Sequence, residues 1–248
     1  MLKEIVITIQ SWGEAHKFII QHKLWKWVLI SGLIYAALFI TGMYFFGKSA
    51  TNVIEYITHI LRLSDWSQQF KNSFLGFLFT FTGIIFWMTL LLFYFSFFKY
   101  ACLIIGSPIF AYLSRKTESI IEHNDHNPGW AEIKKEMGRS IMLALRNCGW
   151  QTVYLIAAII LALIPVVGWI IPLVVLFMEC YYYGFSMLDY ALARNKYSPS
   201  QSIEFTGRHK GLAMGNGILF YLMHLVIPFA PAYAIVAGTL TVHKVKKN

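Results

Sequence analysis

Two uncharged apolar runs limit what this chain can fold into more than any other feature. Residues 27–46 are 20 positions without a charged side chain, and residues 74–98 are 25 such positions. At a rise of about 1.5 Å per residue, a helix over either run is long enough to cross the ~30 Å hydrocarbon core of a bilayer. We therefore predict transmembrane helices over 27–46 and 74–98.

The composition places the whole chain in the same class. Of its 248 residues, 57% are hydrophobic and only 13% are charged, about half the charged fraction that is usual for a soluble domain. We predict an all-α integral membrane protein with a single membrane domain over 1–248. Its expected parts are two transmembrane helices, two re-entrant (hemi-penetrating) helical hairpins and amphipathic cytoplasmic helices.

The first predicted hairpin covers residues 150–193, whose apolar centre LALIPVVGWIIPLVVL is interrupted by Pro165, Gly168 and Pro172. Pro165 has 13 apolar or weakly polar residues on each side, against the ~20 that a crossing needs. Two full crossings would take Glu179 toward the bilayer centre, where a carboxylate is costly. A turn near the midplane would instead leave Glu179 at the headgroups, which favours a re-entrant hairpin.

The second predicted hairpin covers residues 214–243. Its sequence NGILFYLMHLVIPFAPAYAIVAGTLTVH has 11 apolar-rich residues before Pro228 and 11 more from Ala232 to Val242. These arms are again short of a full crossing.

Two amphipathic segments complete the expected architecture. Residues 1–24 are predicted to form an interfacial helix, or else a juxtamembrane anchor, with one apolar face made by Ile5, Ile9, Trp12, Ile19 and Ile20. Residues 114–149 are predicted to be a cytoplasmic helical segment, with an apolar face at four-residue steps made by Ile133, Met137, Ile141 and Leu145.

The basic residues indicate the orientation in the membrane. The chain has 21 Lys and Arg against 12 Asp and Glu, a net charge of +9, and the cations cluster between the apolar runs. We interpret them as topology signals and expect no nucleic-acid partner. With both hairpins returning to the side they left, 17 cations share one side with both termini and three lie on the other. The positive-inside rule makes the termini cytoplasmic. Lys99 is expected to snorkel to the interface.

No catalytic motif or cofactor loop is found, so we expect neither an enzyme nor a bound cofactor. The three cysteines lie in or beside apolar runs and are expected to be inert packing thiols. The stretch HNDH at 123–126 is interpreted as a solvated turn, since two or three ligands rarely make a metal site.

A candidate anion site follows from the hairpins. Half-helices that begin near Gly168 and Pro231 would direct backbone N–H groups and positive dipole ends into the bilayer. Arg115, Arg194 and Arg208 border the apolar runs on the cytoplasmic side and could concentrate anions there, or else act as anchors at lipid phosphates.

Two further site hypotheses concern single residues. Arg194 is the strongest candidate, because Asp189 in LDYALAR is close enough to orient its guanidinium if the helix bends or ends there. His224 lies deep in the second hairpin, where it serves either substrate passage or packing beside Pro228.

The chain resembles the CysZ sulfate permease family and the related etoposide-induced membrane proteins. The resemblance rests on GSPIFAYLSRKTE (106–118), LIPVVGW (163–169), LDYALAR (188–194), GLAMGNG (211–217) and IPFAPAYAIVAGT (227–239). It implies two transmembrane helices with two hemi-penetrating hairpins, an oligomer in the bacterial inner membrane, and sulfate uptake for cysteine biosynthesis.

We accordingly predict an inner-membrane transporter or channel for an inorganic oxyanion, sulfate first. Its expected partners are that anion, membrane lipids and further copies of the chain, because two crossings and two half-depth hairpins give one protomer too little wall for a continuous path. The alternative is a non-transporting structural or assembly factor of the membrane.

Overall fold

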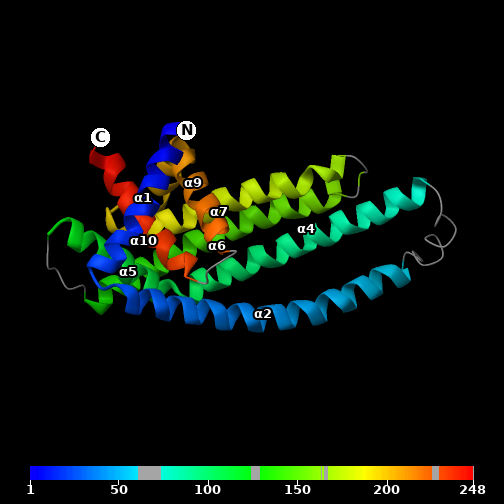
Figure 1. Ribbon diagram of the computed structural model, residues 1–248, viewed down its shortest axis with the longest axis horizontal. Helices are drawn as coiled ribbons and strands as arrows, with labels where there is room; N and C mark the ends of the chain where they lie inside the picture. The colour runs from blue at the N-terminus through cyan, green and yellow to red at the C-terminus, as the bar shows by residue number, and fades with distance from the viewer. Residues whose placement is uncertain (61–73, 124–128, 163, 165–166, 225–228, 248) are drawn as a thin grey trace. The chain divides into compact units, whose positions relative to one another are not determined.

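The computed structural model describes residues 1–60, 74–123, 129–162, 164, 167–224 and 229–247 (Figure 1). Within these residues all regular structure is helical, which confirms the all-α class. The elements are α1 (Leu2–Gln21), α2 (Trp25–Ile60), α4 (Phe74–Ile105), α5 (Ser107–Ile121), α6 (Trp130–Ala162), the 3-10 turn η1 (Val167–Trp169), α7 (Ile171–Arg194), α8 (Pro199–Arg208), α9 (Lys210–His224) and α10 (Ala230–Lys247).

Several helices have the length and composition of membrane spans. Among the described residues, Trp25–Ser49, Trp130–Ala162 and Val167–Arg194 each pass this criterion. A fourth span would result if Ser96–Ile105 and Ser107–Ile121, which meet at a bend of 68°, crossed as one unit. The described residues therefore contain three candidate spans, or four if the bent pair crosses as one. Two crossings with two re-entrant hairpins stays a prediction.

The helices are longer than the sequence patterns indicated. α2 contains the predicted crossing 27–46 and continues to Ile60, and α4 contains 74–98 and continues to Ile105. α6 is one helix of 33 residues, so the expected boundary between the cytoplasmic segment 114–149 and the hairpin 150–193 falls inside it. The arms on either side of the Pro165 region are therefore longer than the 13 residues that the sequence assigned to each.

The chain forms two compact units. The first contains Met1–Ala36, Lys99–Gln151 and Phe177–Asn248, and the second contains Ala37–Phe98 and Thr152–Leu176. In the first unit α1 packs against α9 and α10, and α10 packs against α5. Its apolar interior includes Ile19, Leu113, Tyr183, Leu188, Phe220 and Val236.

α1 buries only part of the apolar face that was predicted: Ile19 of that face is buried and Trp12 packs against the core. Thr8, Ser11, Ala15 and Ile19 are buried. Ile9 and Ile20, which were predicted on the apolar stripe, are exposed. The small side chains allow α1 to approach α9 closely, and Trp12 Nε1 donates a hydrogen bond of 2.8 Å to Asn216 Oδ1. The first helix is thus part of the helical core of this unit.

The buried face of α6 also departs from the predicted one. Ile133 is buried, but Leu145 is 54% exposed, and the buried positions continue through Ser140, Ala144 and Asn147. Four-residue steps advance about 400° around an α-helix, so three of them rotate a position by about 120° away from the starting face. The true face alternates steps of three and four residues.

α7 and α9 cross with their backbones in close contact. A Cβ atom at Gly217 of α9 would overlap the carbonyl group of Cys180, and one at Gly184 of α7 would overlap the carbonyl oxygen of Ala213. Only glycine permits this approach, as in the small-residue interfaces of membrane helices. The crossing therefore brings the side chains that lie one helical turn away from it, on α7 and on α9, close to one another.

The second unit has a smaller apolar core. Leu155, Ala158, Ala162, Ile171 and Val175 pack together with Phe81, whose ring lies 5.0 Å from that of Trp169. Ile160, Ile164, Ile170 and Leu173 are between 46% and 62% exposed. An exposed apolar surface of this kind requires lipid or another apolar partner.

Candidate functional site

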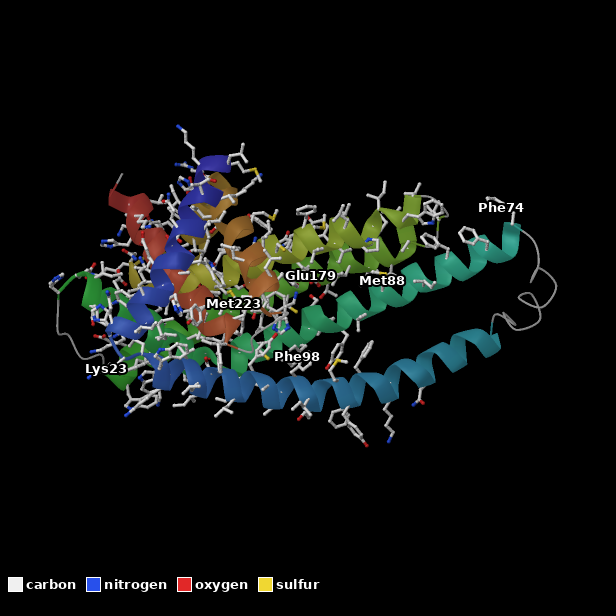
Figure 2. All side chains as sticks on the ribbon, in the orientation of Figure 1. Lys23, Phe74, Met88, Phe98, Glu179 and Met223 are labelled. Atoms are coloured by element: carbon white, nitrogen blue, oxygen red, sulfur yellow. The ribbon has the colours of Figure 1, made fainter. Side chains whose placement is uncertain are left out.

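A buried ion pair lies in the first unit. Lys99 Nζ of α4 donates to Glu179 Oε2 of α7 at 2.6 Å, and the two side chains are 1% and 0% exposed. The Tyr221 hydroxyl of α9 donates to the same carboxylate oxygen. Figure 2 shows Glu179 on α7 among the side chains of the helices. Three helices thus converge on one anionic oxygen.

Aromatic rings surround the Lys99 ammonium. Its Nζ lies 4.3 Å from the ring centroid of Tyr221 and 5.4 Å from that of Tyr183, within the range of cation–π attraction. Behind Tyr183 the Tyr100 hydroxyl donates to Gln151 Oε1 at 2.8 Å. The ammonium is therefore held by one carboxylate and two rings, away from water.

These contacts bear on two predictions. Lys99 does not snorkel to an interface, because it is buried against Glu179. Glu179 is buried among helices and does not lie in a polar surface layer of the protein, and the cost of burying its carboxylate is offset by its two donors. Its depth in the bilayer stays a prediction. The sequence did contain the signal: two opposite charges stood alone beside otherwise apolar runs, and such residues usually find one another.

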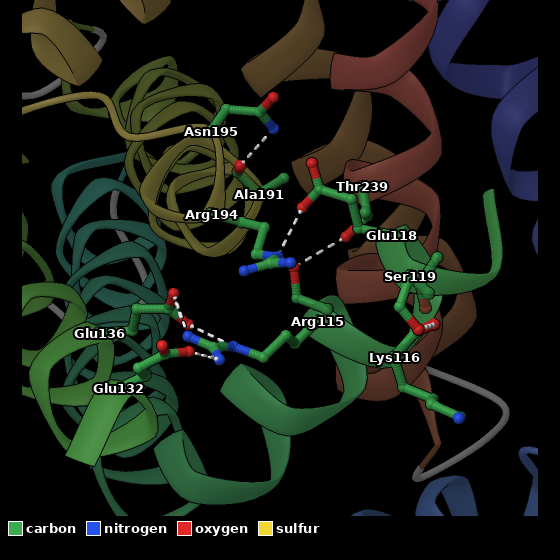
Figure 3. A network of polar contacts seen from close by, with 12 residues as sticks. Arg115, Lys116, Glu118, Ser119, Glu132, Glu136, Ala191, Arg194, Asn195 and Thr239 are labelled. Atoms are coloured by element: carbon green, nitrogen blue, oxygen red, sulfur yellow. Dashed lines mark hydrogen bonds and ion pairs between the residues drawn. The ribbon is translucent and has the colours of Figure 1, made fainter. Parts of the chain in front are cut away.

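Arg115 is fully engaged by acidic residues (Figure 3). Its Nε and Nη2 donate to Glu136 at 3.2 and 2.6 Å, and its Nη1 donates to Glu132 at 2.5 Å. All three guanidinium nitrogens of this 3% exposed side chain are used. Arg115 ties α5 to α6, and three of its five N–H donors are committed to carboxylates.

Arg194 pairs with Glu118 and not with Asp189. Its Nε lies 3.3 Å from Glu118 Oε2 of α5 (Figure 3). Asp189 instead accepts from Arg139 Nη1 at 3.0 Å, so the predicted orientation of Arg194 by Asp189 is wrong. Within the described part of the chain the Nη groups of Arg194 have no carboxylate partner, and the side chain is 20% exposed.

Arg208 lies on the surface of α8. It forms an i,i+4 pair with Glu204 at 2.5 Å, and both side chains are more than half exposed. The two line a surface cavity of about 420 Å³ that also includes Asn195, Lys196, Tyr197, Gln201, Phe205 and His209. Arg208 is therefore separate from the buried pairs, near the C-terminal end of α7.

The remaining predicted site residues have local roles. Gly168 donates its N–H to Ile164 O at 2.8 Å, and Pro231 has no N–H, so neither offers a backbone donor to an anion. His224 Nε2 lies 3.1 Å from the Tyr35 hydroxyl, and its ring stacks on Phe220. The Pro228 expected beside it lies outside the described residues. Gly168 belongs to the second unit and the other predicted residues to the first.

The start of α9 already holds an internal anion. Glu4 Oε2 accepts from the Gly211 N–H at 2.9 Å, and Glu4 Oε1 lies 3.0 Å from His209 Nδ1. A carboxylate at a helix N-terminus satisfies free N–H groups and the positive dipole end. Within the residues the structure describes, no three His, Cys, Asp or Glu side chains gather as a metal ion would need.

Comparison with known proteins adds the family. A model of the family described as Sulfate transporter CysZ/Etoposide-induced protein 2.4 matches residues 11–232. The chain belongs to this family. It is also 26% identical, over 125 residues, to the protein named Sulfate transporter CysZ of Pseudomonas fluorescens. That match covers 50% of each protein, so the chain spans half the length of this curated relative.

Family membership and the geometry together define what the site can do. The predicted family resemblance is confirmed by the match, and the family is named for a transporter. In the first unit the helices bring several cations against carboxylates, whereas within the described residues the Nη groups of Arg194 have no carboxylate partner, and this side chain is 20% exposed. Such a group can bind an oxyanion through parallel N–H···O bonds.

Proposed function

We propose that this protein mediates the passage of an inorganic oxyanion, sulfate first, across the bacterial inner membrane to supply cysteine biosynthesis. The match of residues 11–232 to the transporter family carries the proposal. The printed name of the Pseudomonas fluorescens relative supports sulfate as the first substrate to test. The proposed role is transport without catalysis.

Arg194 is the proposed contact for the anion on the cytoplasmic side. Its Nε lies 3.3 Å from Glu118 Oε2, while its Nη groups have no carboxylate partner in the described residues. Arg115 drops out of the proposed contact set, because Glu132 and Glu136 occupy its three nitrogens.

For the membrane arrangement we propose two crossings and two re-entrant hairpins, with both termini in the cytoplasm. The last charged residue of α6 is Arg146, and only 16 residues follow it to Ala162. They extend about 24 Å as a helix, less than the ~30 Å hydrocarbon core. The 15-residue α9 and the 18-residue α10 likewise fit a shallow second hairpin.

We also propose that the working form is a homo-oligomer. The exposed apolar side chains of α2, which include Leu33, Ile40, Tyr44 and Phe45, need lipid or a second copy as a neighbour. Half-depth hairpins leave a single protomer with too little wall to enclose a path. Size-exclusion chromatography with light scattering in mild detergent is expected to give a stable multiple of the 28.6 kDa chain.

Sulfate flux into proteoliposomes tests the proposal. Purified protein is expected to carry radiolabelled sulfate faster than it carries phosphate or chloride, and faster than empty liposomes. Arg194→Gln is expected to weaken sulfate binding about tenfold or more, since charge-assisted hydrogen bonds contribute ~1.5–3 kcal/mol each. Folded, oligomeric protein without anion flux would contradict transport and favour a structural or assembly role.

Matched variants separate binding from packing. Arg194→Gln/Glu118→Gln keeps the buried charges balanced and is expected to lose sulfate affinity as Arg194→Gln does. Lys196→Gln removes the exposed cation two positions away and is expected to change affinity by less than about twofold, because exposed charges act weakly. Equal effects of Arg194→Gln and Lys196→Gln would reduce Arg194 to one more surface cation.

A further inference from the structure

The Lys99–Glu179 pair has properties that a structural contact does not require. Both residues are at most 1% exposed, and they lie on helices that are otherwise apolar around them. Replacing a buried ion pair by apolar residues of similar volume is often neutral or stabilising. Ionisable residues at such positions in membrane proteins usually belong to ion or substrate pathways.

The geometry of the pair is that of an occupied anion site. Lys99 Nζ and the Tyr221 hydroxyl both donate to one oxygen, Glu179 Oε2. An oxygen atom of a sulfate-like ion could accept the same two hydrogen bonds, since it is also a compact anionic acceptor. The carboxylate of Glu179 therefore stands where a substrate oxygen would bind.

Two aromatic rings lie beside the buried ammonium of Lys99. Tyr221 and Tyr183 lie 4.3 and 5.4 Å from the ammonium, and within the described residues Lys99 makes one hydrogen bond, to Glu179. An ammonium has three N–H donors. The site thus has donor capacity in reserve for an ion with several oxygens.

We propose that Lys99 and Tyr221 form an internal oxyanion-binding site, and that Glu179 is a tethered carboxylate that closes it when no anion is present. This inference rests on the proposed transport function. Exchange of one anion for another keeps the buried charge balanced at every stage, which avoids leaving a lone ammonium in an apolar interior. Lys99 and Tyr221 bind the ion, and Glu179 competes with it.

Three variants test the site in purified, oligomeric protein, with sodium sulfate as the probe. Glu179→Gln removes the competing charge and is expected to lower the sulfate Kd, measured by calorimetry, about tenfold or more. Tyr221→Phe keeps every charge but removes one of the two donors to Glu179, so its sulfate binding is expected to weaken. Lys99→Met/Glu179→Gln removes both charges of this pair, and its sulfate binding and flux are expected to be lost.

The controls distinguish a binding site from a structural pair. Asp189→Asn neutralises another buried carboxylate, the partner of Arg139, and its sulfate Kd is expected to stay within about twofold of the wild-type value. If Glu179→Gln fails to fold, Tyr221→Phe and the double variant decide the question. Unchanged sulfate binding in both of these, or a folded double variant with normal flux, overturns the proposal.

The outcomes also separate this proposal from the transport function. If the wild-type protein shows normal flux, and Glu179→Gln and the double variant bind sulfate as the wild type does, the internal site is contradicted. The transport function then still stands. The opposite outcome is also possible to recognise: the wild-type protein shows no flux, Glu179→Gln binds sulfate more tightly, and the double variant loses this binding. That result supports the internal site and contradicts transport.

Discussion

The close crossing of α7 and α9 predicts an unusual response to a single methyl group. Gly217→Ala would place a Cβ against the carbonyl group of Cys180, where backbone and not a flexible side chain must move. Alanine gains about 1 kcal/mol over glycine in a helix interior, but overpacking costs up to about 3 kcal/mol. We expect a net loss of about 2 kcal/mol in the free energy of unfolding.

The measurement is thermal unfolding in detergent, followed by tryptophan fluorescence. A loss of about 2 kcal/mol corresponds to a Tm lower by roughly 4–8 °C for a chain of this length. Gly138→Ala on α6 is the matched control, because a Cβ there meets no heavy atom within 4 Å. It is expected to raise the Tm slightly through helix propensity.

The difference in Tm between the Gly217→Ala and Gly138→Ala proteins tests how closely α7 and α9 cross. A Gly217→Ala protein that is as stable as the Gly138→Ala protein would show that the helices do not cross this closely. The variant has a second effect, since Tyr221 is one turn beyond Gly217 and Glu179 adjoins Cys180. Separation of the helices is expected to weaken the Tyr221–Glu179 hydrogen bond.

Other predictions concern the ion pairs and the topology. Arg115→Gln leaves Glu132 and Glu136 without their shared cation and is expected to destabilise the protein by about 2–3 kcal/mol. This loss is at or below the low end of the ~3–5 kcal/mol that breaking a buried ion pair costs, because Glu132 is half exposed. An unchanged Tm would contradict this expectation. In a cysteine-free background, Trp169→Cys is expected to resist membrane-impermeant thiol reagents added from outside, whereas Ser64→Cys is expected to react. Rapid outside labelling at position 169 would instead support full crossings by α6 and α7.

Sequence patterns were sufficient for the all-α class and for the helices over the uncharged runs 27–46 and 74–98, but they did not predict α8. Runs without charge predict helices in lipid because length and transfer energy act locally along the chain. Helix ends were missed where a helix continued past the apolar run, as at Ile60 and Ile105. A polar residue does not stop a helix when neighbouring helices or water satisfy its side chain, so hydropathy alone underestimates helix length.

The partners of charged residues were beyond what the sequence could supply. Asp189 and Arg194 are five positions apart, yet they take different partners, Arg139 and Glu118, that are 50 and 76 positions away. Five residues turn a helix by about 500°, so the two side chains leave on different faces. Local spacing could exclude their pairing but could not name the residues that tertiary packing brings to them.

The ion pairs have a consequence for the surface that the net charge alone understates. Within the described residues, eight acidic side chains are committed to ion pairs. Lys3, Lys17, Lys23 and Lys26 near the N-terminus are exposed and have no carboxylate partner in the described residues. Each lysine near an anionic membrane surface contributes about 1 kcal/mol of attraction. The protein should therefore leave the membrane with phosphatidylglycerol or cardiolipin still attached, and high-salt washes should strip these lipids.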